Sequence, residues 1–125
     1  MKVSELSEEF LNYWVAKAEG FDLDDENWFV KPGQTIWRGN FWPTEKWALG
    51  GEIIEKNAIH LIAPGKGDRD WFAFIDDDFD LEDGYTHGIC GHGPTPLVAA
   101  MRVYVASKFG DEVEDMAEIG KQQPK

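Results

Sequence analysis

Two histidines and the single cysteine of the chain, His87, Cys90 and His92, lie close together in the sequence. Imidazole nitrogens and a thiolate are ligands that Zn²⁺ prefers, and His60 would complete a tetrahedral site. Structural zinc sites normally contain a second closely spaced pair of ligands, whereas His60 is a lone histidine within an apolar strand. We therefore expect no metal at this cluster.

The same cluster is also the nearest approach to a catalytic centre, because a thiol beside an imidazole can act as a nucleophile. It lies in a glycine-rich segment, and nothing in the sequence orients an imidazole or forms an oxyanion hole. The acids Asp76, Asp78 and Asp80 begin like a calcium loop, but Leu81 stands where that loop requires glycine. These patterns favour a non-catalytic protein without a cofactor.

Thr95 and Arg102 are the residues best suited to bind an anion. Thr95 is the predicted N-cap of a helix over residues 97–109, with Pro96 at the first helical position. The first amide groups of such a helix carry partial positive charge. Arg102 is expected to form a buried ion pair, with a contact to a ligand as the alternative. The segment before the helix lacks the Lys-Ser or Lys-Thr of a phosphate-binding loop, so nucleotide hydrolysis is not predicted.

Tryptophans are concentrated in the region that is predicted to form strands. Those within strands are expected to fill the core, whereas a loop containing Trp42 and Trp47 is the candidate for an exposed contact with a partner. The neighbouring Gly50 and Gly51 belong to the same candidate surface. The five tryptophans of this region are Trp28, Trp37, Trp42, Trp47 and Trp71.

Two helices are expected to support these residues. The first follows Ser7 as N-cap and stops at Gly20, with Glu8, Glu9, Asn12 and Glu19 on its polar side. Its apolar side contains Phe10, Leu11, Trp14, Val15 and Ala18.

The helix over residues 97–109 is apolar almost all round, which predicts burial against both the sheet and the first helix. Its small Ala99 and Ala106 would permit close approach, either to a neighbouring element or across a homodimer.

Short β-prone runs occur at residues 28–31, 34–38, 52–55, 58–63 and 71–75. Pro32-Gly33 predicts a type II turn between the first two runs. Gly50-Gly51 is interpreted as the turn that introduces the third, and residues 76–92 as a long surface excursion. We expect an α+β fold in which a small antiparallel sheet of about five strands packs against an N-terminal and a C-terminal helix.

Length and composition support one domain. The chain has 125 residues, of which 42% are hydrophobic, enough for a single core. We assign residues 1–114 to a single α+β domain and expect a polar, frayed tail over 115–125. The single cysteine allows no internal disulfide, polar residues follow Met1, and no apolar run is long enough to span a membrane. The expected location is the cytoplasm.

The chain is strongly acidic, with 24 Asp and Glu against 12 Lys and Arg and a net charge of -12. Direct binding of nucleic acid is not expected, because it depends on clustered cations. The acids are concentrated in residues 22–26, 68–83 and 111–118. Such regions keep a protein soluble and can steer basic partners, and mimicry of a nucleic acid is a further alternative.

Three blocks carry a family resemblance: residues 11–20, residues 44–51 with 53–55, and the segment from Gly93 through Val113. On these blocks the chain resembles the NinX-like family of bacteriophage proteins of unknown function. Glu52 stands where that family would have a proline. This difference affects the expected shape of the adjoining turn but not the resemblance itself. The resemblance implies a small accessory protein in the cytosol of an infected bacterium, without assigned catalytic residues.

The leading hypothesis is therefore a non-catalytic phage accessory protein that binds a host or phage protein. Its contact would be the loop with Trp42 and Trp47 or an acidic face. The alternative is a small enzyme or a sensor of an anionic ligand, built around the helix end at Thr95 and around Arg102.

Overall fold

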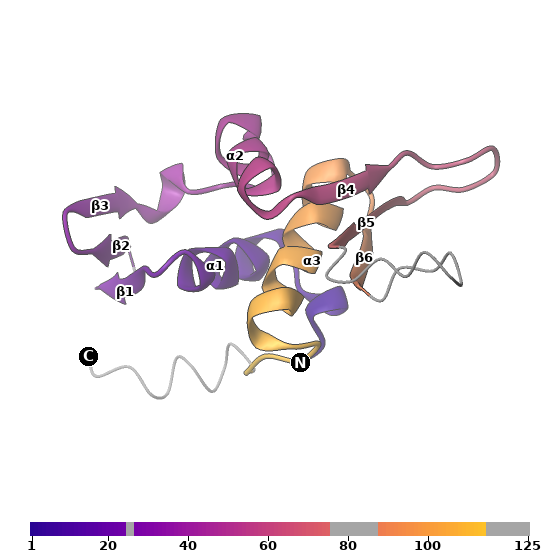
Figure 1. Ribbon diagram of the computed structural model, residues 1–125. Helices are drawn as coiled ribbons and strands as arrows, with labels where there is room; N and C mark the ends of the chain where they lie inside the picture. Colours follow the sequence, from indigo (N-terminus) through magenta and orange to yellow (C-terminus); the bar gives the residue numbers. More distant parts are fainter. Residues whose placement is uncertain (25–26, 76–87, 115–125) are drawn as a thin grey trace.

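The computed structural model describes residues 1–24, 27–75 and 88–114. Within these ranges the chain forms three α-helices, two short 3-10 helices (η1, Val3–Glu5, and η2, Arg38–Asn40) and two antiparallel sheets of three strands each. The sheets lie at opposite ends of the molecule with the helices between them (Figure 1). The predicted α+β class is confirmed. The predicted tail, residues 115–125, lies outside the described residues.

The prediction of one sheet of about five strands is wrong. The first sheet contains β1 (Asp22–Asp24), β2 (Trp28–Lys31) and β3 (Gln34–Trp37), and the second contains β4 (Ile59–Ile62), β5 (Trp71–Ile75) and β6 (Ile89–Gly93). The helix α2 (Trp47–Asn57) separates them in the sequence, where a strand over residues 52–55 was predicted.

Close packing explains why α2 contains Gly50, a residue that the sequence pattern assigned to a turn. A Cβ atom on Gly50 would lie 2.5 Å from the main-chain oxygen of Pro43 and 2.6 Å from Cδ2 of Leu97. The glycine therefore lets the helix contact two other segments at a distance that no side chain would permit. Such a contact is made between residues far apart in sequence, so the local pattern does not reveal it.

The β2–β3 hairpin follows the prediction from Pro32-Gly33. Gly33 has φ 81°, as the third position of a type II turn requires. The strand register places Leu23, Phe29 and Ile36 side by side on one face of the sheet. Phe29 is buried at 1% exposure, and its ring packs near the rings of Phe21 and Phe41. This face is the inner face of the first sheet.

Strand β6 begins within the segment predicted to be a surface excursion, and that prediction is wrong for residues 89–92. The strand pairs with β5 and contains Gly91 and Gly93, which weaken its β pattern. A Cβ atom on Gly93 would lie 2.7 Å from the amide nitrogen of Ala99, so the glycine allows a helix to pack directly on the strand. Residues 76–87, including the calcium-like acids and His87, lie outside the described residues.

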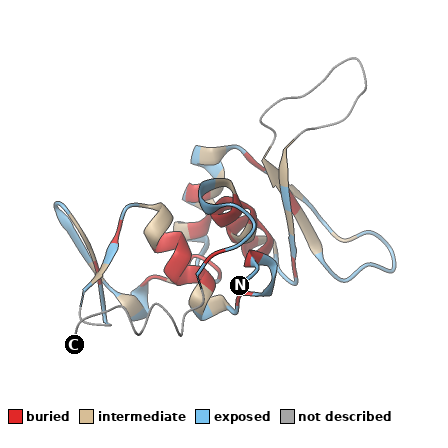
Figure 2. Cartoon of the chain, turned by 90° about the horizontal axis from the view of Figure 1, so that it is seen from below, coloured by how far each residue is buried: buried red, intermediate tan, exposed pale blue. Residues whose placement is uncertain are grey.

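The helix α3 (Pro96–Phe109) confirms the clearest prediction. Thr95 caps it, because its Oγ1 accepts a hydrogen bond of 3.1 Å from the amide of Val98. The helix packs on β5 and β6 and beside α1 (Glu8–Ala18), and it is red along most of its length in Figure 2. Ala99 is fully buried against β6, so its close approach is made within the chain.

The first helix begins after Ser7 as predicted, but the side chain of Ser7 makes no capping hydrogen bond, and Asn12 differs from the prediction. Asn12 was placed on the polar side, yet it is 3% exposed. Its side-chain amide donates to Oγ1 of Thr44 at 3.0 Å, while its Oδ1 accepts from the amide of Thr44 at 3.1 Å. This reciprocal pair attaches the loop before α2 to α1.

A buried tyrosine connects the end of α1 to α3. The hydroxyl of Tyr104 donates to Oε2 of Glu19 at 2.6 Å. Burial, and then the hydrogen bond to Glu19, raise the pKa of Tyr104 well above its ordinary value. A tyrosine that is stabilised in its neutral form contributes stability below the ordinary tyrosine pKa of about 10 and loses that contribution as the pH rises further.

We therefore expect Tyr104→Phe to lower the free energy of unfolding at pH 7 by about 1.5–3 kcal/mol, the range for a hydrogen bond to a charged group. Above about pH 10 the difference from wild type should shrink, because the wild-type hydroxyl ionises on unfolding. Thermal unfolding followed by circular dichroism between neutral and alkaline pH measures both effects. A constant difference across this range would contradict the assignment.

Candidate functional site

The loop predicted to contact a partner is only partly exposed. Trp47 begins α2 and is 56% exposed, whereas Trp42 is half-buried. The main-chain oxygen of Trp42 accepts from the amides of Glu45 and Lys46 at 2.9 and 2.8 Å. Gly50 is buried in the contact described above, and Gly51 lies beside the ring of Trp47. Of the predicted aromatic loop, Trp47 therefore offers the larger contact surface.

Two other tryptophans form a surface that the sequence did not predict. Trp28 and Trp37 lie directly opposite each other on β2 and β3 and are 43% and 51% exposed. The expectation that tryptophans within strands fill the core is wrong for both. Successive side chains point to opposite faces, so the two indoles point away from the buried Phe29 and the partly buried Ile36.

We call the outer side of this sheet the aromatic face. The register places its members on one side of the three strands. Its six residues are Asp22, Asp24, Trp28, Val30, Thr35 and Trp37.

The ring of Trp37 packs against Gly39. A Cβ atom on Gly39 would lie 2.7 Å from two carbon atoms of this ring, so the indole rests on the backbone of η2. The neighbouring Arg38 anchors the end of the hairpin. Its guanidinium lies 3.8 Å from a carboxylate oxygen of Glu9 and over the rings of Tyr13 and Phe29. The position of the Trp37 ring is therefore set by contacts within the chain.

Carboxylates border the two indoles. Asp24 lies opposite Trp28 in the strand register, and Asp22 lies opposite Val30. The side chain of Asp22 is 81% exposed, and one of its oxygens is 3.2 Å from Nζ of Lys17. Indole faces attract cations, and Lys and Arg side chains pair with carboxylates. The chemistry of this face suits cationic side chains.

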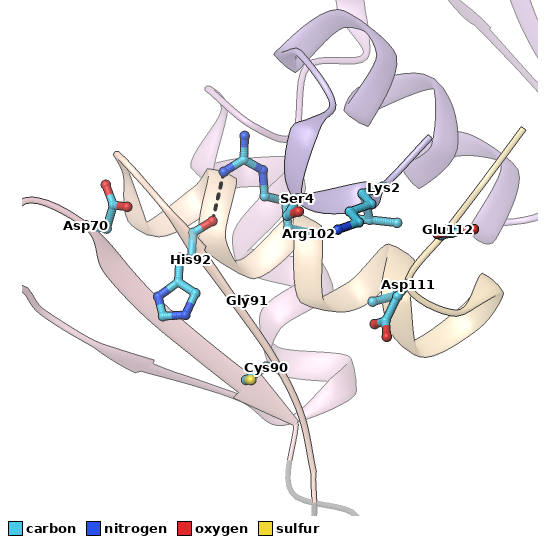
Figure 3. Close-up of a pocket in the computed structure, with 11 residues that line it drawn as sticks. Lys2, Ser4, Asp70, Cys90, Gly91, His92, Arg102, Asp111 and Glu112 are labelled. Atoms are coloured by element: carbon cyan, nitrogen blue, oxygen red, sulfur yellow. Dashed lines mark hydrogen bonds between the residues drawn. The ribbon is translucent and has the colours of Figure 1, made fainter. Parts of the chain in front are cut away.

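A second candidate site surrounds Arg102. A pocket of about 520 Å³ is bounded by the N-terminal segment, the start of β5, β6, α3 and the residues after α3. Figure 3 shows Asp70, His92 and Arg102 on one side and Lys2, Asp111 and Glu112 on the other. We call this site the Arg102 pocket.

Main-chain oxygens hold the guanidinium in the Arg102 pocket. Nη1 donates to the carbonyl of His92 at 2.9 Å and Nη2 to the carbonyl of Leu6 at 3.3 Å. Burial lowers the pKa of Arg102 from its ordinary value. The sequence predicted a buried ion pair, but among the described residues no carboxylate lies within 4.0 Å of this guanidinium.

Thr95 and Arg102 do not form one site. Thr95 does not line the Arg102 pocket, and its side chain is engaged in capping α3. The predicted site that combined the helix end at Thr95 with Arg102 is therefore not formed, and only Arg102 lines the pocket.

The described members of the predicted zinc cluster make aromatic contacts. His60 stacks on Phe74 at 4.5 Å between ring centroids, and His92 packs against Phe72 at 5.0 Å. Cys90 is exposed and free. Within the part of the chain that the structure describes, no three His, Cys, Asp or Glu side chains are placed to share a metal ion. His87 lies outside that part.

Comparison with known protein families identifies the chain's family. The model of a protein family described as "Bacteriophage P22, NinX" matches residues 2–108, a range that contains the aromatic face and most of the Arg102 pocket. No curated protein matches the chain. Among the described residues, no helix has both the length and the apolar character needed to cross a bilayer.

Proposed function

Because the chain belongs to the NinX family of bacteriophage proteins, we propose that it is a phage accessory protein that binds a basic segment of a host or phage protein through the aromatic face. The observation that carries this proposal is the pair of exposed indoles, Trp28 and Trp37, beside Asp22 and Asp24.

Exposed tryptophans support a protein contact. Tryptophan is among the residues that contribute most to binding energy at interfaces, because it buries a large rigid surface. Here two such side chains lie side by side on a sheet whose other face packs against the core through Phe29, Leu23 and Ile36. The ring of Trp37 is already seated on Gly39, so binding loses little conformational entropy there.

The charge of the chain indicates a basic partner. The protein has a net charge of -12, and the aromatic face contains two aspartates and no lysine or arginine. Lys or Arg side chains of a partner can pair with the carboxylates and can also pack on the indole faces. The same aspartates repel phosphate, which disfavours direct contact with nucleic acid. Much of the acidic sequence that would serve mimicry of a nucleic acid, residues 76–83 and 115–118, lies outside the described residues.

We expect Trp28→Ala and Trp37→Ala each to weaken binding of the recovered partner by about 30-fold or more, as for a residue that contributes about 2 kcal/mol at an interface. Proteins are first captured from a lysate of the bacterial host on the wild-type chain. The affinity of each recovered protein is then measured by titration against the wild type and the variants. Trp47→Ala is the matched control, because it removes an exposed indole outside the aromatic face.

Gly39→Ala gives a sharper version of the same test. The added methyl group displaces the ring of Trp37 without removing it, so affinity should fall while the fold is retained.

The double variant Asp22→Asn with Asp24→Asn should slow association with the partner and reduce the dependence of the association rate on salt. If Trp47→Ala abolished capture while Trp28→Ala and Trp37→Ala retained it, the contact with the partner would be the loop before α2 and not the aromatic face.

A further inference from the structure

We propose that the Arg102 pocket binds a small zwitterion with one carboxylate and one ammonium group, such as a free amino acid. The carboxylate would contact Arg102 and the ammonium group would contact Asp70. This site is separate from the aromatic face, so the proposal does not depend on the proposed function.

The pocket has the size of a small-molecule site, and most of the residues that line it are polar. Its volume of about 520 Å³ falls within the usual range of about 300–1,000 Å³ for small-molecule sites. Its polar side chains come from segments far apart in the sequence, with Lys2 at one end of the chain and Glu112 near the other. The folded chain therefore brings together cations and acids that have no local relation.

Arg102 is preorganised for a planar anion. Two of its N–H groups donate to the carbonyls of His92 and Leu6, which holds the guanidinium in place. Each of its terminal nitrogens retains a second N–H group, and Nε has no partner among the described residues. Arg102 is half-buried and has no carboxylate within 4.0 Å among the described residues, so an incoming carboxylate could pair with it through two parallel hydrogen bonds.

The acids of the pocket select against a purely anionic ligand. Asp70, Asp111 and Glu112 border the same space, and they would repel phosphate or a dicarboxylate. Asp70 is the acid whose charge acts most strongly on Arg102, and its exposed carboxylate makes no hydrogen bond or ion pair with the described residues. A ligand of zero net charge satisfies both groups.

A peptide strand is a poorer occupant of this pocket. Strand β6 is at the edge of its sheet, and an open edge can accept an added strand. Arg102 already occupies the carbonyl of His92 on that edge, which blocks continuous pairing. The pocket therefore favours a small molecule.

Titration of the full-length isotope-labelled protein, followed by its amide NMR signals, tests the proposal. The probes are glycine, 4-aminobutyrate and 6-aminohexanoate, which span a range of charge separations, with acetate, methylammonium and inorganic phosphate as single-charge probes. We expect at least one zwitterion to shift the amide signals of Gly91 and Ala106 and to bind about tenfold or more tightly than acetate or methylammonium.

Variants distinguish this site from general charge effects. Asp70→Asn should weaken binding of that zwitterion by about tenfold or more, whereas Asp68→Asn in the same loop should leave it unchanged, because Asp68 does not line the pocket. Arg102→Lys should also weaken binding if the variant folds. The proposal would be overturned if no zwitterion bound, if acetate or phosphate bound equally well, or if Asp70→Asn bound like wild type. Trp28→Ala should have no effect on this titration.

Discussion

Val98→Asp is expected to abolish cooperative folding. Val98 is 2% exposed on α3, where the helix packs directly on the glycines of β6. An aspartate there would place an unpaired carboxylate among apolar side chains at a cost of several kcal/mol, which is comparable with the whole stability of about 5–15 kcal/mol of a domain. Differential scanning calorimetry and near-ultraviolet circular dichroism measure the loss.

The matched control for this substitution is Lys108→Asp, at an exposed position near the end of the same helix. Its effect should stay within about 2 kcal/mol, because the charge reversal removes one favourable interaction with the helix dipole and adds one unfavourable interaction, each of up to about 1 kcal/mol. If Val98→Asp melted cooperatively within a few degrees of the control, the central position of α3 in the core would be wrong.

Gly50→Ala and Gly51→Ala should change stability in opposite directions, although the two glycines are adjacent in α2. At Gly50 the new methyl group would lie 2.5 Å from a main-chain oxygen of Pro43, so the helix must move away from the loop and from Leu97. Overpacking of this kind costs about 1–3 kcal/mol. At Gly51 the nearest atom is 3.8 Å away, and replacing a helical glycine by alanine stabilises by about 0.5–1 kcal/mol.

Chemical denaturation of both variants measures this contrast. The expected result is a lower midpoint for Gly50→Ala and a higher one for Gly51→Ala, with the slope unchanged. Stabilisation by both substitutions would mean that α2 does not contact Pro43 and Leu97 as closely as described. The pair therefore tests the element whose structure the sequence did not predict.

The two proposed sites are independent of each other in space. The aromatic face belongs to the sheet at one end of the molecule, and the Arg102 pocket lies beside β6 of the other sheet (Figure 1). A variant of one site should leave binding at the other unchanged, unless the substitution affects the core between them.

Elements with strong local determinants could be predicted from the sequence. The cap at Thr95, Pro96 and the apolar run that follows predict α3, and Pro32-Gly33 predicts the β2–β3 hairpin. In each case the decisive interactions join residues a few positions apart. The helix at the N-terminus follows from the same kind of pattern, except that the partner of Asn12 is thirty-two positions away.

Elements that depend on distant contacts could not be predicted. The glycines of α2 and β6 weaken the local pattern of each element, and they are present because another segment lies against the backbone. Gly50 contacts Pro43 and Leu97, and Gly93 contacts α3. A glycine that makes room for a neighbour and a glycine that makes a turn look the same in a sequence.

The sequence by itself determined the residue types that the candidate sites use, together with the acidic character, the family and the two terminal helices. The tertiary structure decided which of those residues are accessible and which share a site. Trp28 and Trp37 point outward because Phe29 is buried and Ile36 is partly buried on the opposite face of the same strands. Arg102 borders a pocket because residues 2–4 and 111–112 lie near β6 there. Local interactions determine most of the helices and strands, whereas packing between distant segments determines which face of each one is buried.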